Sequence, residues 1–402
     1  MVTMSIKRQF YFNALFDVEL GGFSTTALKQ SAAEMTTLFL PLSAANDTVH
    51  LDVDIHDTFL DYLHYYHFKE QSEALTSIFS NLNNCIVWGW NQQVIEKLML
   101  IDGNLFPSLE TVKEVNGRQF CSKLCEKYGL GVPNSYFCTT EKEVKSIVYA
   151  TEQNFPLLLK ANYGNAGFGI RVLNHSAQMK NQNGLIKHHL SCGGLVIEPY
   201  YERITDLTTA VIVGRDGNCG PIYYQQQQVN RHGAYYANYC SDGDDVINRW
   251  KEELKRVSLL LGRAIAAKGY FGPVGIDFFV YYDRFGKERL ASAIDINARF
   301  TMGLMAQMLR KCFAPGKEIL FRFISKKKCC LPETISAWKE LCGSNHFSEK
   351  NRSGILLLNP PRIRFKDRWT QPQRSAFLLA ADSKKQLKSL DRELRTFLSR
   401  KR

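Results

Sequence analysis

The sequence lacks the features that mark membrane and secreted proteins. None of its uninterrupted apolar runs reaches the roughly 18–20 residues that span a bilayer. The N-terminal twelve residues have no apolar stretch followed by a small-residue cleavage site, so we expect no secretory signal. The 11 cysteines are scattered, and neither Cys121 with Cys125 nor the adjacent Cys329 and Cys330 has the spacing of a zinc ribbon or a redox pair. These absences predict a cytoplasmic protein with reduced thiols and no membrane partner.

Acidic residues are also fewer than basic ones, which leaves a net charge of +12 and a pI near 9.1. Much of the basic excess lies late in the chain, at residues 326–328, 362–368 and 400–402. An excess of this sign favours an anionic partner: a nucleotide, a nucleic acid or a membrane surface. No signature of a common RNA- or DNA-binding module is present, and charge runs are usually solvated faces or tails. Nucleic acid is therefore not expected as the main partner.

A chain of 402 residues is too long for one ordinary core, and the sequence predicts three units. In residues 1–110, strand patterns such as 37–42 and 85–90 alternate with helix patterns such as 57–66, which predicts an α/β layer with parallel strands. This part has no glycine-rich dinucleotide fingerprint, so we expect a supporting or substrate-facing domain. The second unit would cover residues 111–330, and the third, residues 331–402, would end in the basic tail.

A glycine-rich hairpin follows a strand in the second unit. An apolar strand ends in Lys160, glycines stand at positions 164, 167 and 169, and a second strand is expected at 170–173. Strand–loop–strand differs from the strand–loop–helix order of a P-loop or a dinucleotide-binding turn. Glycines let the backbone fold over phosphates and donate N–H groups, and Lys160 would add positive charge. Taken alone, a plain turn remains the alternative.

A second informative stretch is residues 291–303, ASAIDINARFTMG. Asp295, Asn297 and Arg299 alternate, and alternate side chains of a strand lie on one face. Asp277 lies in the preceding apolar strand, one turn away, and would face Asp295 across a hairpin. Two carboxylates on one buried face repel each other unless a cation lies between them. Oxygen ligands of this kind suit Mg²⁺, and arginine suits phosphate or carboxylate; the alternative is a solvated strand with an incidental ion pair.

Together, the order of these features over residues 112–308 resembles the ATP-grasp superfamily. Residues 1–110, including Asn13 and the Trp-Gly-Trp-Asn turn at 88–91, are similar to the pre-ATP-grasp domain of pheganomycin-type peptide ligases. Residues 353–360 and 377–381 are similar to the carboxy-terminal portion of those ligases. The resemblance implies an α/β (α+β) ATP-grasp fold with an N-terminal α/β domain, a small C-terminal subdomain and a lid at about residues 135–200.

The resemblance also implies roles for individual residues. The cofactors would be ATP and one or two Mg²⁺ ions, with Mn²⁺ as an alternative metal. The residues implied in nucleotide binding are Lys160, Tyr163, Gly164, Gly167, Gly169, Glu198, Tyr200, Tyr201 and Asp206. The implied metal ligands are Asp277, Asp295 and Asn297. The implied catalytic cations are Arg299, Lys160 and Arg231. Arg299 would face the transferred phosphoryl group or the substrate carboxylate, and Lys160 and Arg231 would contact phosphates.

The implied activity is that of an ATP-dependent, ADP-forming carboxylate–amine ligase. It would make an amide or peptide bond through an acyl phosphate, with amino acids or peptides among its small-molecule substrates. Three departures stand against the family pattern: Asp295 replaces the usual glutamate, Ala298 replaces the usual proline, and an early lysine has Arg118 as its nearest counterpart. Because of these departures, a non-catalytic ATP-binding protein that acts as a partner or regulator remains an alternative. Kinase-like transfer of a phosphoryl group to a hydroxyl is another. Whether the chain forms a homodimer stays open.

Overall fold

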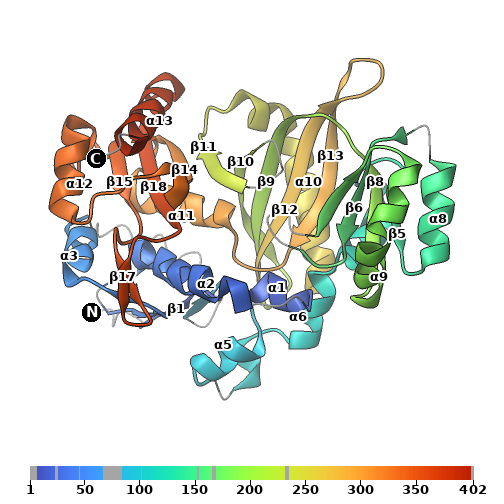
Figure 1. Ribbon diagram of the computed structural model, residues 1–402, viewed down its shortest axis with the longest axis horizontal. Coiled ribbons are helices and arrows are strands. Elements are labelled where there is room, and N and C mark those ends of the chain that lie inside the picture. The colour runs from blue at the N-terminus through green and yellow to red at the C-terminus, as the bar shows by residue number, and fades with distance from the viewer. Residues whose placement is uncertain are drawn as a thin grey trace.

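An antiparallel eight-stranded sheet lies at the centre of the molecule (Figure 1). In the computed structural model the described residues are 7–22, 26–44, 46–66, 84–100, 102–151, 154–164, 169–230 and 235–399. In spatial order the strands of this large sheet are β13 (Glu288–Asn297), β12 (Gly272–Tyr282), β9 (Arg203–Val213), β10 (Cys219–Val229), β11 (Tyr235–Cys240), β14 (Glu318–Ser325), β18 (Arg374–Ala381) and β15 (Gly354–Leu357).

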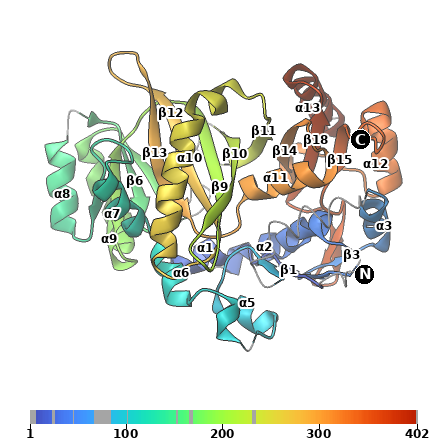
Figure 2. The ribbon, with the colours of Figure 1, turned by 180° about the vertical axis from the view of Figure 1, so that it is seen from behind.

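Two helices cover one face of the large sheet. Helices α10 (Asp245–Ala266) and α11 (Met302–Phe313) lie behind the sheet in Figure 1 and in front of it in Figure 2. Each begins at a side-chain cap: Asp244 accepts from the backbone N–H of Ile247 at 2.9 Å, and Thr301 accepts from that of Leu304 at 3.2 Å. Because these helices bury one face, polar residues of the middle strands gather on the other.

A separate four-stranded sheet lies beside the large one, at the right of Figure 1. Its strands, in spatial order, are β5 (Tyr136–Cys138), β8 (Leu195–Pro199), β6 (Leu157–Ala161) and β7 (Ile170–Leu173). Helices α8 (Glu141–Ala150) and α9 (Asn183–Ser191) pack on one face and enclose a small core that contains Leu159 and Leu173. The Thr140–Glu143 capping box expected at the start of α8 is present.

The N-terminal region contains the parallel layer that the sequence predicts. Strand β1 (Gln9–Tyr11) lies between β2 (Thr48–His50) and β4 (Cys85–Val87), and both pairings are parallel. The prediction of a strand at residues 37–42 is wrong, because this stretch is the 3₁₀ helix η2 (Thr36–Leu42). All seven residues of η2 are buried, so its continuous apolar pattern does not distinguish a helix from a strand.

The first and last parts of the chain pack against each other. The Tyr62 hydroxyl accepts a hydrogen bond from the backbone N–H of Leu357 at 3.0 Å. Strand β3 (Asp54–Ile55) pairs with β16 (Ile363–Phe365), which in turn pairs with β17 (Arg368–Thr370). Strands on both sides of residue 330 belong to the large sheet, and the three-unit division stays a prediction.

The remaining helices lie around these sheets. The α-helices are α1 (Phe16–Leu20), α2 (Lys29–Met35), α3 (Asp57–Tyr65), α5 (Gln92–Lys97), α6 (Leu109–Val115), α7 (Arg118–Tyr128), α12 (Ile335–Cys342) and α13 (Lys384–Ser399). The other 3₁₀ helices are η1 (Thr26–Leu28), η3 (Gly103–Leu105), η5 (Ser176–Gln182), η6 (Lys326–Lys328) and η7 (Gly343–Asn345). Among the described residues, no helix combines the length and the apolar character needed to cross a bilayer.

Candidate active site

Two carboxylates face each other on the open side of the large sheet. Asp277 on β12 and Asp295 on β13 are register partners, as the sequence predicts. The next strand places Thr208 beside Asp277, whereas its neighbour Thr209 points to the covered side and contacts Ser258 of α10 at 2.7 Å. Strand alternation therefore puts the acid pair on the face that α10 leaves uncovered.

The electrostatics of this pair are unfavourable without added positive charge. Burial raises the pKa of Asp277 to about 6, and the nearby Asp295 carboxylate contributes to the increase. Asn297 Nδ2 donates to Asp277 Oδ2 at 3.0 Å. On the other acid, Arg118 Nη2 lies 2.6 Å from Asp295 Oδ2. Arg118, at the start of α7, thus balances one of the two charges, whereas Arg299 and the hydrogen bond from Asn297 compensate the Asp277 charge only in part.

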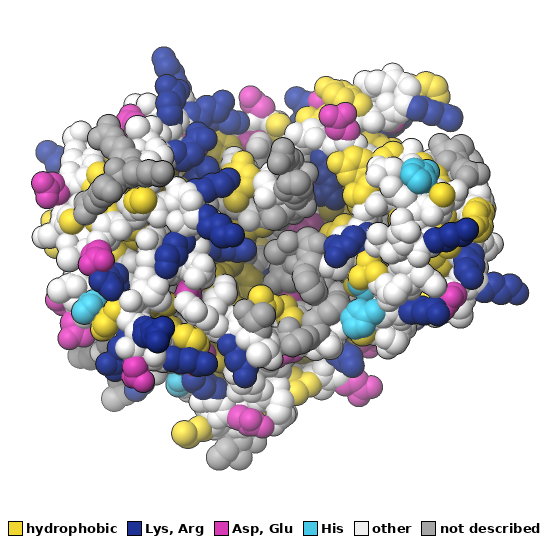
Figure 3. Space-filling view, in the orientation of Figure 1, with side chains coloured by type: hydrophobic (Ala, Val, Ile, Leu, Met, Phe, Trp, Pro, Cys, Tyr) yellow, Lys and Arg dark blue, Asp and Glu magenta, His cyan; other side chains and the backbone are white. Residues whose placement is uncertain are grey.

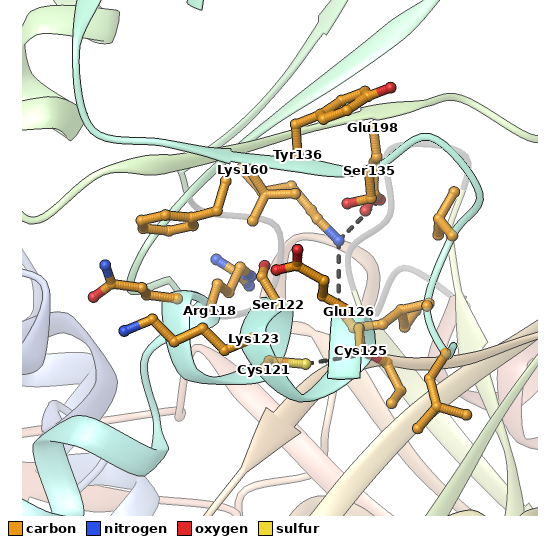
Figure 4. A pocket seen from close by; sticks show the side chains of 18 of the residues that line it. Arg118, Cys121, Ser122, Lys123, Cys125, Glu126, Ser135, Tyr136, Lys160 and Glu198 are labelled. Carbon is orange, nitrogen blue, oxygen red and sulfur yellow. Dashed lines mark hydrogen bonds and ion pairs between the residues drawn. The ribbon is translucent and has the colours of Figure 1, made fainter. Parts of the chain in front are cut away.

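Lys160 lies at the end of β6 in a buried ion pair. Its Nζ is 2.8 Å from Glu198 Oε1 on β8 and donates to the carbonyl oxygen of Ile294 at 3.3 Å. Both side chains are almost fully buried, with 6% and 4% of their surface exposed. Figure 4 shows the Lys160 ammonium group between the small sheet and the underlying strand, with Arg118 nearby. Two cations from different elements, Lys160 of β6 and Arg118 of α7, therefore line the same cavities, and groups of this kind can bind phosphate.

The glycine-rich stretch is described only at its two ends. Gly169 has a φ of +81°, a conformation that glycine adopts readily, and its carbonyl oxygen accepts from the Ala161 N–H at 2.9 Å. The Tyr163 hydroxyl donates to the Lys113 carbonyl oxygen at 3.3 Å, and Gly164 lines a cavity with the acid pair. Gly167 lies outside the described residues.

The expected hinge follows β8. The backbone N–H of Tyr200 donates to the Pro156 carbonyl oxygen at 2.8 Å, and the Tyr200 side chain is exposed. The Tyr201 ring lies 4.4 Å from the Tyr281 ring, in an apolar cluster that includes Ile294. Asp206 is held by Arg203 at 2.6 Å, although burial raises the pKa of its carboxyl group. Arg203 therefore competes with any ligand for this carboxylate.

Arg299 faces the N-terminal region as well as the acid pair. Its Nε lies 2.7 Å from Asp17 Oδ1, and its Nη2 donates to Asn297 Oδ1 at 3.0 Å. The guanidinium carbon lies 4.9 Å from the centre of the Trp88 ring. Arg299 is thus fixed between the first unit and the metal-type ligands. Arg231, the third expected catalytic cation, lies outside the described residues.

Two cavities meet at these residues. The first, of about 770 Å³, lies between α7, the turn before β5 and the small sheet (Figure 4). The second, of about 250 Å³, lies over the acid pair. Arg118, Lys160 and Ile294 line both cavities. The face seen in Figure 3 is hollowed near its middle, and Lys and Arg side chains lie along the hollow. The combined space is of the size that ligand sites have.

The donor set fits a magnesium ion that a bound phosphate helps to hold. Asp277, Asp295 and Asn297 supply two carboxylates and an amide oxygen on neighbouring strands. In the described part of the chain, no group of three or more His, Cys, Asp or Glu side chains could hold a metal by itself. Mg²⁺ is commonly bound through one or two carboxylates plus phosphate oxygens and water, so this small set is adequate.

Sequence reasoning missed several residues that the fold brings to the site. Asp17, Arg203 and Arg374 come from three distant segments, and no local pattern points to them. Arg118 was noted only as the nearest counterpart of a lysine, and its position after Gly117 at a helix start was the available signal. Its pairing with Asp295 depends on tertiary contacts.

Comparison with known proteins supports the fold over nearly the whole chain. No family model matches the sequence. The chain is 25% identical over 202 residues to the "[Butirosin acyl-carrier protein]--L-glutamate ligase" of Niallia circulans. That match covers 48% of this chain and 45% of the relative, so the chain spans less than half the length of the curated relative it matches.

Solved structures match at lower identity but higher coverage. N5-carboxyaminoimidazole synthetase from Staphylococcus aureus matches with a TM-score of 0.55, 10% identity and coverage of 97% of this chain and 98% of that chain. N5-carboxyaminoimidazole ribonucleotide synthetase from Thermus thermophilus has a TM-score of 0.54, 13% identity and coverage of 98% and 99%. Biotin carboxylase from Campylobacter jejuni has a TM-score of 0.53, 13% identity and coverage of 96% and 90%. These likenesses confirm the fold expected from the sequence.

Proposed function

We propose that this chain, whose fold is that of the ATP-grasp superfamily, is an ATP-dependent, ADP-forming carboxylate–amine ligase. The observation that carries the proposal is that Lys160, Arg118 and Arg299 line the same cavity as the facing acids Asp277 and Asp295. The relative named above is a ligase of L-glutamate and an acyl-carrier protein, and the structural neighbours are a synthetase and a carboxylase, which supports ligase chemistry for this chain. Acid and amine substrates would meet in the 250 Å³ cavity.

The proposed reaction has two steps. A carboxylate oxygen attacks the γ-phosphorus of ATP, the bond to the bridging oxygen breaks, and ADP leaves with an acyl phosphate formed. An amine nitrogen then attacks the acyl carbon, the carbon–oxygen bond to phosphate breaks, and an amide and inorganic phosphate result. Both steps depend on positioning and positive charge more than on a protein base.

The residues of this chain would have different roles according to where they lie in the site. Lys160 and Arg118 would hold the nucleotide phosphates, with the adenine beside Glu198 and Tyr201. Arg299, fixed by Asp17, would orient the reacting carboxylate. Asp277, Asp295 and Asn297 would hold Mg²⁺, which neutralises phosphate charge when bound. The expected lid would exclude water from the acyl phosphate, which otherwise hydrolyses.

Trapping with hydroxylamine tests this proposal. The purified chain is incubated with Mg·ATP, pooled carboxylic acids and hydroxylamine, and hydroxamate and phosphate are measured. We expect hydroxamate that requires both ATP and an acid, and a loss of at least about 100-fold in Asp277→Asn. Asp216→Asn, in an exposed turn beyond the end of β9, is the matched control. Mg·ATP hydrolysis that no acid stimulates would contradict a ligase.

One observation supports a second candidate function, a non-catalytic nucleotide-binding protein. The Arg118–Asp295 ion pair, 2.6 Å long, already occupies a carboxylate that the metal would use, and aspartate is shorter than the usual glutamate. Calorimetry that detects Mg·ATP binding by a chain that forms neither hydroxamate nor phosphate would favour this alternative. Turnover that disappears in Asp295→Ala would exclude it.

A further inference from the structure

One cation that lines the 250 Å³ cavity has no carboxylate to balance it in the described part of the chain. The cationic side chains of the cavity wall are Arg118, Lys160, Arg203, Arg299 and Arg374. The first four form ion pairs with Asp295, Glu198, Asp206 and Asp17, respectively. Among the described residues, the Arg374 guanidinium has no such partner. This difference marks Arg374 as the cation that remains available to an anionic ligand.

The backbone at Arg374 is held from two sides. The preceding residue, Gln373, donates its N–H to Glu34 Oε2 of α2 at 2.6 Å. The Arg374 carbonyl oxygen accepts from Asn359 Nδ2 at 2.9 Å. Arg374 also begins β18 and pairs with Ser325 of β14. Its Cα is thus fixed relative to both the N-terminal and C-terminal regions, while its exposed side chain is free to adjust to a ligand.

The surroundings of Arg374 suit an amphipathic molecule. Phe12, Met35, Trp88 and Met302 contribute apolar surface to the cavity, whereas Gln227 and Asn238 contribute amide groups. The acid pair and Arg299 occupy the inner part, where the proposed function places the reacting carboxylate and phosphate. Arg374 is exposed, whereas Arg299 is buried, so Arg374 lies at a more solvent-accessible part of the cavity wall.

We propose that Arg374 binds the carboxylate of the amine substrate, which is therefore an amino acid or a peptide that reacts through its amino group. This inference depends on the ligase function proposed above. A guanidinium recognises a carboxylate through two parallel hydrogen bonds, so it fixes direction as well as charge. With its carboxylate held near the entrance, the substrate would present its neutral amine to the acyl carbon. Phosphate then leaves with the bonding electron pair, and the amine proton passes to solvent or phosphate.

The test compares pooled L-amino acids with pooled L-amino acid amides as amine substrates, each with Mg·ATP and pooled acids. In the wild-type chain we expect the free amino acids to give at least about 10-fold more coupled product at limiting concentration. Arg374→Gln should raise the KM for the amino acids by about 10- to 100-fold and remove the preference. Hydroxamate formation should fall far less than amino-acid coupling in Arg374→Gln, because hydroxylamine carries no carboxylate. Arg368→Gln, an exposed arginine of β17 outside the cavity, is the control.

The outcomes separate this inference from the ligase proposal. If hydroxamate forms but free amino acids and their amides are coupled equally well, the role of Arg374 is overturned while the ligase proposal stands. The same holds if Arg374→Gln keeps the preference for free amino acids. If no hydroxamate forms, the ligase proposal fails. The role of Arg374 in carboxylate binding is then tested by the melting temperature of the chain with each pool. Amino acids should then raise the melting temperature of the wild-type chain in Mg·ATP more than their amides do. An equal effect of both pools, or the same difference in Arg374→Gln, would overturn it.

Discussion

The two principal sheets are built in different ways. The eight-stranded sheet shares one large core with helices from both ends of the chain, whereas the four-stranded sheet has a small core of its own. The contacts between them include three polar ones, Lys160 to Ile294, Arg118 to Ala161 and the Gly131–Ser292 bridge, and a small apolar cluster that contains Tyr201 and Tyr281. Because the small sheet has a separate core, we expect it to unfold locally without the large one. The candidate site lies where the two sheets meet.

The largest expected effect on turnover comes from a substitution in the large sheet. Asp277→Asn removes a proposed metal ligand, so we expect the proposed turnover to fall by about 100- to 1,000-fold in phosphate release. The same change removes a carboxyl group whose pKa is raised to about 6 by burial and by the Asp295 charge, so the melting temperature at pH 7.5 should rise. A lower melting temperature would show that the Asp277 charge is already balanced in the free protein.

The polar connection between the sheets is tested at Lys160. Lys160→Met leaves the Glu198 carboxylate buried without a partner, which should cost about 3–5 kcal/mol of stability and lower Mg·ATP affinity by about 100-fold. Adding Glu198→Gln should restore most of the stability but not the affinity. Chemical denaturation and calorimetry measure the two quantities. Recovery of both would mean that Lys160 serves the fold alone.

Matched core substitutions test whether the sheets unfold separately. Leu173→Ala in the small core and Leu254→Ala in the large core each remove a fully buried side chain, at a cost of about 2–5 kcal/mol. We expect Leu173→Ala to increase proteolysis within residues 135–200 while the large sheet stays protected in hydrogen exchange. Leu254→Ala should destabilise the entire chain. Identical exchange patterns in the two variants would contradict separate cores.

A smaller effect on stability is expected when the pH is lowered. His189 of α9 is buried, and burial lowers its pKa to about 4. The unfolded chain binds this proton near pH 6.5 whereas the folded chain does not, so stability is complete above pH 6.5 and is lost as pH falls toward 4. The cost at pH 5 is about 2 kcal/mol at most and should fall on the small sheet. His189→Leu should flatten the pH dependence of exchange protection there but not in the large sheet.

The sequence predicts well the features that depend on local pattern. The capping box at Thr140, the strand that carries Lys160 and the facing of Asp277 and Asp295 follow from periodicity and turn residues, and all are present. The prediction of a strand at residues 37–42 is wrong because all of these residues are buried. Burial on every side removes the apolar–polar periodicity that separates a 3₁₀ helix from a strand. The ATP-grasp fold was confirmed, but the roles of the individual site residues stay predictions.

Ion-pair partners were beyond what the sequence alone could reveal. Asp17 lies 282 residues from Arg299, and Arg118 lies 177 residues from Asp295. No spacing rule links residues so far apart, because the fold alone decides which segments meet. For the same reason the sequence did not single out Arg374, whose only distinguishing property is the absence of a partner among the described residues.

The order of strands in the large sheet has a consequence for how the protein is made. Strand β14 lies between β11 and β18, and β18 is followed in space by β15, which precedes it in the chain. The N-terminal region depends on these late strands, because Tyr62 bonds to Leu357 and Glu34 to Gln373. During synthesis, the first 110 residues must therefore wait for β18 to leave the ribosome before they reach their final contacts. We expect slow completion of folding and a need for protection from aggregation in that interval.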